Sequence, residues 1–188
     1  LLFDEVVRLL PREVELGEAQ AHFGTLPPRY FLIHNTQEIV TDIALASRFM
    51  RNLLSHDPDV SLAPAIEWAD KPDRGCSRVT VCTWDRAGLF GKLAGSCTAA
   101  GLNILSAQIF TRTDGIVLDA FDVTSARTGV LATKEEQEKF GQILSKALVG
   151  QVAAAQRDVQ GKRRAALDHT VHAHGAAVQA HELVHESE

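Results

Sequence analysis

The segment Ser77–Leu148 constrains the fold most, because strand and helix signals alternate along it in an order that few folds accommodate. Three stretches have the β-branched, alternating composition of strands: Ser77–Thr83, Asn103–Arg112 and Ile116–Thr124. Apolar residues recur at helical spacing over residues 89–100, and Gly101 suits the end of that helix. A capping box at Thr133–Glu136 begins a second helix. The predicted order is therefore β-α-β-β-α.

This order is one strand short of the ferredoxin-like βαββαβ arrangement, in which four antiparallel strands lie beneath two helices. We expect the missing strand at Ala177–His185, beyond the second helix. A further strand is expected at Val60–Trp68, ahead of the others, and Pro64 within it favours a position at the edge of the sheet. The predicted fold class is α+β, with a ferredoxin-like βαββαβ sheet.

Residues 1–57 are expected to form a helical connecting segment ahead of this sheet. A helix is predicted from Asn35 or Thr36, with Glu38 in its first turn. The two prolines of Leu26–Phe31 favour an extended entry or a turn ahead of that helix, because each proline disfavours the helical conformation of the residue before it. The expected division is 1–57 for the helical segment, 58–150 for the leading strand and the βαββα unit, and 151–188 for a linker with a possible final strand.

Composition excludes several classes of function. The formal net charge of −5 provides no positive field for nucleic acid. No apolar run approaches the roughly 20 residues that would span a bilayer. The three cysteines form no CxxC pair, which favours reduced thiols and a cytoplasmic protein. Because the chain opens at Leu1 and its one methionine is Met50, we expect it to be a piece of a longer protein.

The loop Asp85–Leu89 is the stretch best suited to bind a ligand. Backbone N–H groups at the start of the helix that follows it suit a carboxylate, and the Asp85 side chain suits an ammonium group. Together they could hold both ends of an amino acid, and Asn103 at the start of the next strand could add an amide contact. The alternative is that Asp85 only caps the helix and Gly88 only turns the chain.

Several motifs of this segment resemble those of an ACT domain. They are Asp85-Arg86-x-Gly88-Leu89-Phe90, Ala100-Gly101-Leu102-Asn103-Ile104, Ala107, Asp114-Gly115 and Leu118-Asp119-x-Phe121. An upstream block completes the likeness: Leu26-Pro27-x-Arg29-Tyr30-Phe31-Leu32, His34 and Glu38-Ile39. The combination is similar to the ACT region of the bifunctional uridylyltransferase/uridylyl-removing enzymes that modify PII proteins. The resemblance covers residues 26–148 and departs from the family at Ala87, where a proline is usual.

The resemblance implies a regulatory function in nitrogen control. Glutamine is the implied effector, a second ACT domain or a homodimer the implied neighbour, and the PII protein the implied partner of the parent enzyme. The implied effector-binding residues are Asp85, Arg86, Ala87, Gly88, Leu89, Asn103 and Ile104. Mg²⁺ is implied only for the catalytic domains of the parent, and no cofactor is expected in this chain.

We do not expect the chain itself to be catalytic. A nucleotidyltransferase needs paired aspartates after a glycine-serine loop to hold its metal ions, and no such pair follows Gly95-Ser96. The family's hydrolytic half resembles a metal-dependent His-Asp domain, but Pro58 follows His56-Asp57 at once and would end a helix there.

Two alternatives remain open. The first is an ACT module that regulates another amino-acid-controlled enzyme. The second is a small zinc hydrolase, because His181-Glu182-Leu183-Val184-His185 fits the HExxH pattern. On a helix, His181 and His185 would face one way and could bind zinc, with Glu182 as general base. No other metal site is expected.

Overall fold

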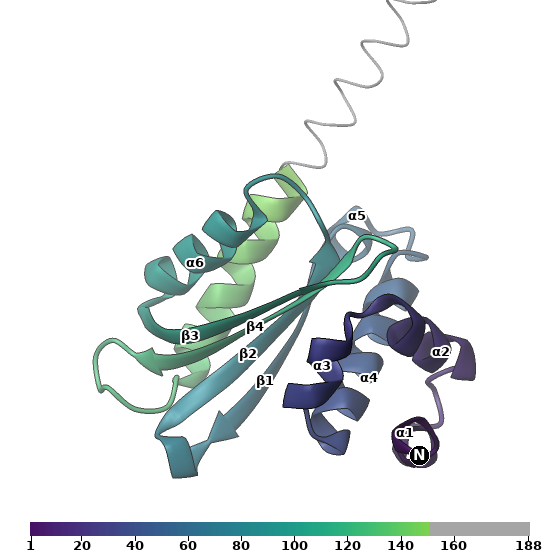
Figure 1. Ribbon diagram of the computed structural model, residues 1–188. Helices are drawn as coiled ribbons and strands as arrows, with labels where there is room; N and C mark the ends of the chain where they lie inside the picture. Colours follow the sequence, from purple (N-terminus) through teal and green to yellow (C-terminus); the bar gives the residue numbers. More distant parts are fainter. Residues whose placement is uncertain (151–188) are drawn as a thin grey trace, which may run out of the picture. The chain divides into compact units, whose positions relative to one another are not determined.

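The computed structural model describes residues 1–150, so the predicted strand at Ala177–His185 and the zinc ligands His181 and His185 lie outside the described residues. Within them, a four-stranded antiparallel sheet has the order β1-β2-β4-β3 (Figure 1). Its strands are β1 (Ala65–Lys71), β2 (Cys76–Trp84), β3 (Leu102–Thr111) and β4 (Ile116–Ser125). The three strands predicted after residue 76 are confirmed, each within two residues of its expected ends.

Strand β1 occupies an unexpected place in the sheet. It pairs antiparallel with β2, on the side away from β4. That is the position the last strand of a βαββαβ fold would take, so the sheet reaches four strands without residues 177–185. The expected edge position is confirmed, but the expected start at Val60 is wrong. The chain forms a short helix, α5 (Pro58–Ser61), and Pro64 stands just ahead of the strand.

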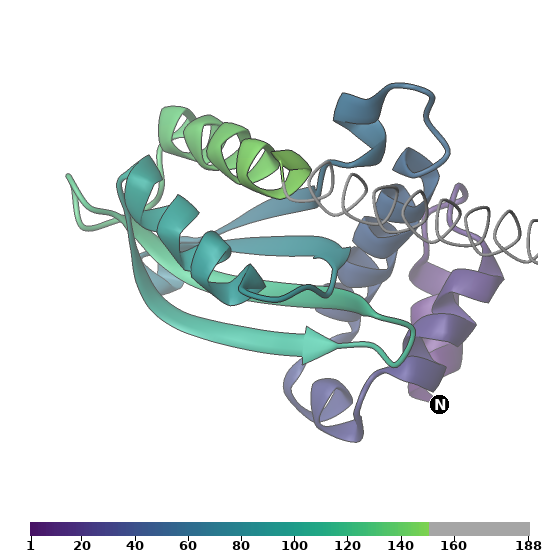
Figure 2. The ribbon, with the colours of Figure 1, turned by 90° about the horizontal axis from the view of Figure 1, so that it is seen from above.

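Two helices cover one face of the sheet, as the sequence predicted. They are α6 (Leu89–Ala100) and a helix over residues 134–150, which lie side by side in Figures 1 and 2. The Thr133–Glu136 capping box is present, with reciprocal bonds between the Thr133 and Glu136 side chains and backbone N–H groups. The buried core beneath these helices comprises Val79, Val81, Leu93, Phe121, Val123, Phe140 and Leu144.

The opposite face is covered by the N-terminal helices (Figure 1). They are α1 (Leu2–Leu9), α2 (Leu16–Thr25), α3 (Pro28–Ile33) and α4 (Thr36–Asn52). Because both faces are covered, β4 is buried along its whole length. Of the two residues expected to start α4, Asn35 is the N-cap: its side chain accepts from Glu38 N–H at 2.9 Å, and Glu38 accepts from Asn35 N–H at 3.1 Å, which completes a capping box.

The expected extended entry at Leu26–Phe31 is wrong, because α3 begins there. Pro28 stands in the first turn of α3, where the missing N–H would have no helical partner in any case. Only Leu26 and Pro27, the residues directly before a proline, are extended. No helix of residues 1–150 combines the length and apolar character needed to cross a membrane.

Candidate functional site

The predicted effector loop joins β2 to α6 and depends on one glycine. Gly88 has φ +74° and is the N-cap residue of α6, a conformation that residues with a Cβ rarely adopt. No side chain caps α6, so the alternative in which Asp85 caps this helix is wrong. The backbone N–H groups of Phe90 and Gly91 have no acceptor among residues 1–150. The helix therefore presents uncompensated donors beside the exposed Asp85.

Arg86 holds the loop in place. Its guanidinium donates to the Leu148 carbonyl at 3.2 Å and to the Thr83 hydroxyl at 3.1 Å. The Leu148 carbonyl belongs to the helix over residues 134–150. Burial lowers the pKa of Arg86. The arginine that the resemblance places in the effector site thus connects the loop to a neighbouring helix.

A second carboxylate lies near the loop, inside the core. Asp119 on β4 is paired in register with Val81 and is 2% exposed. Its Oδ1 has no hydrogen-bond partner among the described residues. Burial raises the pKa of Asp119 to about 7, and the negative charge of Asp85 acts in the same direction. A hydrogen bond with the Phe110 backbone opposes the change. The sequence motif contains Asp119, but its burial was not foreseen.

The sheet separates the remaining predicted residues from this loop. Trp84, just before Asp85, pairs with Ile116 at one end of β4. Asn103 pairs with Thr124 at the other end, about 26 Å away at about 3.3 Å per residue. Asn103 and Ile104 are exposed on the edge strand β3. One chain therefore brings Asp85 to Leu89 together but not Asn103 and Ile104 with them.

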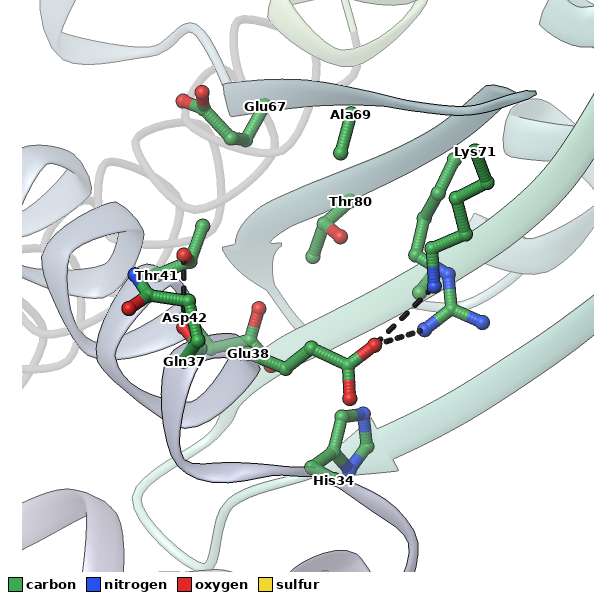
Figure 3. Close-up of a pocket in the computed structure, with 11 residues that line it drawn as sticks. His34, Gln37, Glu38, Thr41, Asp42, Glu67, Ala69, Lys71 and Thr80 are labelled. Carbon is green, nitrogen blue, oxygen red and sulfur yellow. Dashed lines mark hydrogen bonds and ion pairs between the residues drawn. The ribbon is translucent and has the colours of Figure 1, made fainter. Parts of the chain in front are cut away.

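A cavity that the sequence did not reveal lies between α4 and the sheet (Figure 3). Its volume is about 190 Å³, and β1 and β2 form its wall opposite α4. We call it the α4 cavity. The residues that line it are His34, Gln37, Glu38, Thr41, Asp42, Glu67, Ala69, Lys71, Arg78, Thr80 and Ala120. The lining thus combines carboxylates, cationic side chains and small residues of the sheet.

An ion-pair network closes one end of the α4 cavity. Glu38 accepts from Lys71 Nζ at 3.2 Å and lies 3.5 Å from Arg78 Nη1, as the dashed lines of Figure 3 trace. Arg78 also forms two bonds to Asp122, at 2.8 and 3.1 Å. Burial opposes ionisation of Glu38, but the Asn35 N–H and Lys71 outweigh it and lower the pKa of Glu38. Arg78 likewise lowers the pKa of Asp122 against the effect of burial.

Asp42, further along α4, has a different environment. It is 7% exposed, and its Oδ2 accepts a hydrogen bond of 2.6 Å from the Tyr30 hydroxyl. No cation among residues 1–150 lies within ion-pair distance of it. Burial raises the pKa of Asp42 to about 6, although the Tyr30 hydrogen bond opposes the change. In the sequence, the only signal was an acidic residue inside the apolar stripe of α4.

The described residues contain no group of three or more His, Cys, Asp or Glu side chains that could hold a metal ion. His56 and Asp57 lie in a loop just before α5, as expected.

The fold defines the class of this protein: an α+β module with a four-stranded antiparallel sheet, compatible with a ferredoxin-like arrangement.

No family model matches the chain. It is, however, similar to bifunctional uridylyltransferase/uridylyl-removing enzymes. The enzyme of Rhodospirillum rubrum is 34% identical over 145 residues, which cover 76% of this chain and 15% of that enzyme. The enzyme of Azospirillum brasilense is 28% identical over 141 residues, 74% of this chain and 14% of that enzyme. That of Bradyrhizobium sp. (strain ORS 278) is 31% identical over 153 residues, 79% of this chain and 16% of that enzyme.

The expected resemblance is confirmed: this chain is homologous to a region of the bifunctional uridylyltransferase/uridylyl-removing enzymes. It spans about 15% of the length of these relatives.

Proposed function

We propose that this chain is an amino-acid-sensing ACT module of a uridylyltransferase/uridylyl-removing enzyme, with glutamine as effector. The observation that carries the proposal is the uncapped N-terminus of α6 beside the exposed carboxylate of Asp85. Free N–H groups at a helix start favour an anion, and Asp85 favours an ammonium group. An α-amino acid has both groups on one carbon, so this pairing suits its zwitterion.

The backbone of the loop supports this reading. Gly88 lets the chain enter α6 in the left-handed conformation, and because a Cβ built there would meet no atom within 4 Å, the space over the loop is open. Arg86 fixes the loop through Leu148 and Thr83, so the donors are held before a ligand arrives. A preorganised site loses less entropy on binding.

Asn103 and Ile104 enter the proposal through a second copy. They lie on β3, the edge strand, whose backbone groups on the outer side are unpaired by the sheet. Two copies related by a two-fold axis perpendicular to the sheet, at the outer side of β3, would pair antiparallel, which places the Asn103 end of one strand beside the Thr111 end of the other. Thr111 lies at the loop end of the sheet, so a homodimer or a second ACT domain would complete the effector site.

The catalytic centres, the PII substrate and Mg²⁺ are assigned to the rest of the parent enzyme. In this proposal glutamine stabilises one arrangement of the module, and its differential affinity for two arrangements sets the size of the regulatory effect, typically about 1–3 kcal/mol.

Calorimetric titration of the 188-residue chain with L-glutamine tests the proposal. We expect saturable binding that is lost in Asp85→Ala and kept in Asp73→Ala, which removes an exposed carboxylate from the turn before β2. Saturation by another amino acid, lost in the same variant, would instead indicate a module of a different amino-acid-controlled enzyme. Binding that is unchanged in Asp85→Ala would refute the site. Stoichiometric zinc lost in His181→Ala, with a measurable hydrolysis rate, would support the zinc hydrolase.

A further inference from the structure

We propose that the α4 cavity is a second binding site, for one small zwitterionic amino acid whose ammonium group binds Asp42 and whose carboxylate binds Lys71. The cavity lies on the face of the sheet opposite α6, so this site does not depend on the effector loop.

The charges of the lining are already compensated, except at Asp42. Glu38 pairs with Lys71 and Arg78, and Glu67 pairs with Arg48 at 3.0 Å. Both Glu38 oxygens are in use, because Oε2 accepts from the Asn35 N–H. Asp42 accepts only the Tyr30 hydroxyl on Oδ2, and Oδ1 receives no donor among the described residues. A buried carboxylate without a cationic partner favours an ammonium group, since desolvation otherwise penalises its charge.

The Thr80 hydroxyl, on the sheet side of the cavity, can also accept a hydrogen bond from an ammonium group, in addition to Asp42. His34 Nδ1 lies 2.9 Å from the Tyr30 carbonyl, which can only accept, so this ring nitrogen donates to Tyr30.

The other end of the cavity suits a carboxylate. Lys71 Nζ has three N–H donors and gives one to Glu38 at 3.2 Å. Glu38 and Asp42 are four residues apart on α4, hence neighbours on one face of that helix. An amino acid carries its ammonium and its carboxylate on one carbon, and each can form a hydrogen bond of about 2.8 Å. The ligand can therefore join two protein groups that are separated by roughly one helical turn.

Volume limits the ligand to a small molecule. The cavity holds about 190 Å³, somewhat more than the roughly 150 Å³ that accommodates a benzene molecule in a dry protein cavity. Ala69 and Ala120 keep the sheet side open, because a larger side chain at either position would occupy this space. An amino acid with a short side chain therefore fits.

The experiment measures thermal shifts of the 188-residue chain with each of the twenty amino acids, followed by calorimetry with those that bind. For at least one of them we expect a site whose affinity falls about tenfold or more in Asp42→Asn, the loss expected for one charge-assisted hydrogen bond. The asparagine is isosteric, and Tyr30 can still donate to its oxygen. Asp73→Asn is the matched control, and Asp85→Ala must leave this site intact, which separates it from the effector loop.

Ala69→Leu provides a second route, since it fills the cavity from an exposed position of β1 and should also abolish binding. Lys71→Met should weaken the amino acid but not methylammonium. The proposal is overturned if no amino acid binds in an Asp42-dependent way, if Ala69→Leu leaves that binding unchanged, or if methylammonium binds as tightly as the amino acid.

Discussion

His22 on α2 offers a sharp test of how the helical layer is stabilised. Its side chain is 0% exposed, and neither ring nitrogen has a hydrogen-bond partner among the described residues. The ring packs edge-on against Tyr30, with 5.1 Å between centroids, and near Phe31. Burial, with a smaller contribution from the charge of Arg112, lowers the pKa of His22 to about 3. We expect His22→Leu to stabilise the protein by about 1–3 kcal/mol at pH 7, the cost of an unsatisfied buried polar group.

The pH dependence follows from the sign of the shift. A histidine with a pKa of about 3 in the folded state and about 6.5 unfolded binds its proton more tightly when unfolded. The contribution of neutral His22 to the free energy of unfolding is therefore full above pH 6.5, and it is lost as the pH falls toward 3. Between pH 7 and pH 5 the wild type should lose about 2 kcal/mol through His22 alone, from about 1.5 pKa units at about 1.36 kcal/mol each.

Urea unfolding of the wild type and His22→Leu at pH 7 and pH 5, followed by far-UV circular dichroism, measures both effects. Asp42 and Asp119, with pKa values raised to about 6 and 7, titrate in the same range but in both proteins, so the difference isolates His22. The helix propensity gained with leucine does not depend on pH. Substitution of the exposed His56 by leucine is the control and should leave the pH dependence unchanged. If His22→Leu loses as much stability as the wild type between pH 7 and pH 5, the buried neutral histidine is refuted.

Two further predictions concern stability. Gly88→Ala should destabilise by roughly 1–2 kcal/mol, because alanine must adopt φ +74° although nothing lies within 4 Å of its Cβ; Gly91→Ala, inside α6 with the same free space, should stabilise by roughly 0.5–1 kcal/mol, and equal effects in thermal unfolding would contradict the conformational explanation. Arg78→Met should cost roughly 1–3 kcal/mol, because the 3%-exposed Asp122 loses its bidentate partner and keeps Arg74 at 3.6 Å and the Ser106 hydroxyl. Adding Asp122→Asn should recover part of that loss in denaturant titrations, and no recovery would show that the charge left behind is not the cause.

The features that the sequence predicted well are those with local causes. The capping box at Thr133 joins residues three apart, so its side-chain types suffice to locate that helix start, and at α4 they narrow the start to Asn35 or Thr36. The edge position of β1 was expected from Pro64, although that residue stands just ahead of the strand and not in its ladder. The hairpin between β3 and β4 turns at Gly115 with φ +88°, as the Thr113-Asp114-Gly115 signal indicated.

The features that it missed depend on residues far apart in the chain. β1 takes the fourth position in the sheet through its antiparallel pairing with β2, and no local pattern states which strand fills an edge. The motif predicts that Asn103 and Asp85 belong to one effector site, but the register of β4 with its two neighbours places them at opposite ends of the sheet. Asp42 looked like an acidic interruption of an apolar helix face, and only packing of α4 on the sheet shows that it faces a cavity.

The central strand β2 connects the two proposed sites. Thr80 and Arg78 line the α4 cavity, while Val79 and Val81 pack beneath α6 and the strand continues into the Asp85 loop. A ligand in either site therefore contacts an element that positions the other. Any coupling between them must be reciprocal: the factor by which an amino acid in the cavity changes glutamine affinity at the loop equals the factor by which glutamine changes affinity at the cavity. Packed interfaces switch between discrete arrangements and do not deform continuously, so one route for such coupling is a change between two arrangements of β2 relative to α4. The Arg78 bridge to Glu38 on α4 and Asp122 on β4 is the contact that would differ between them.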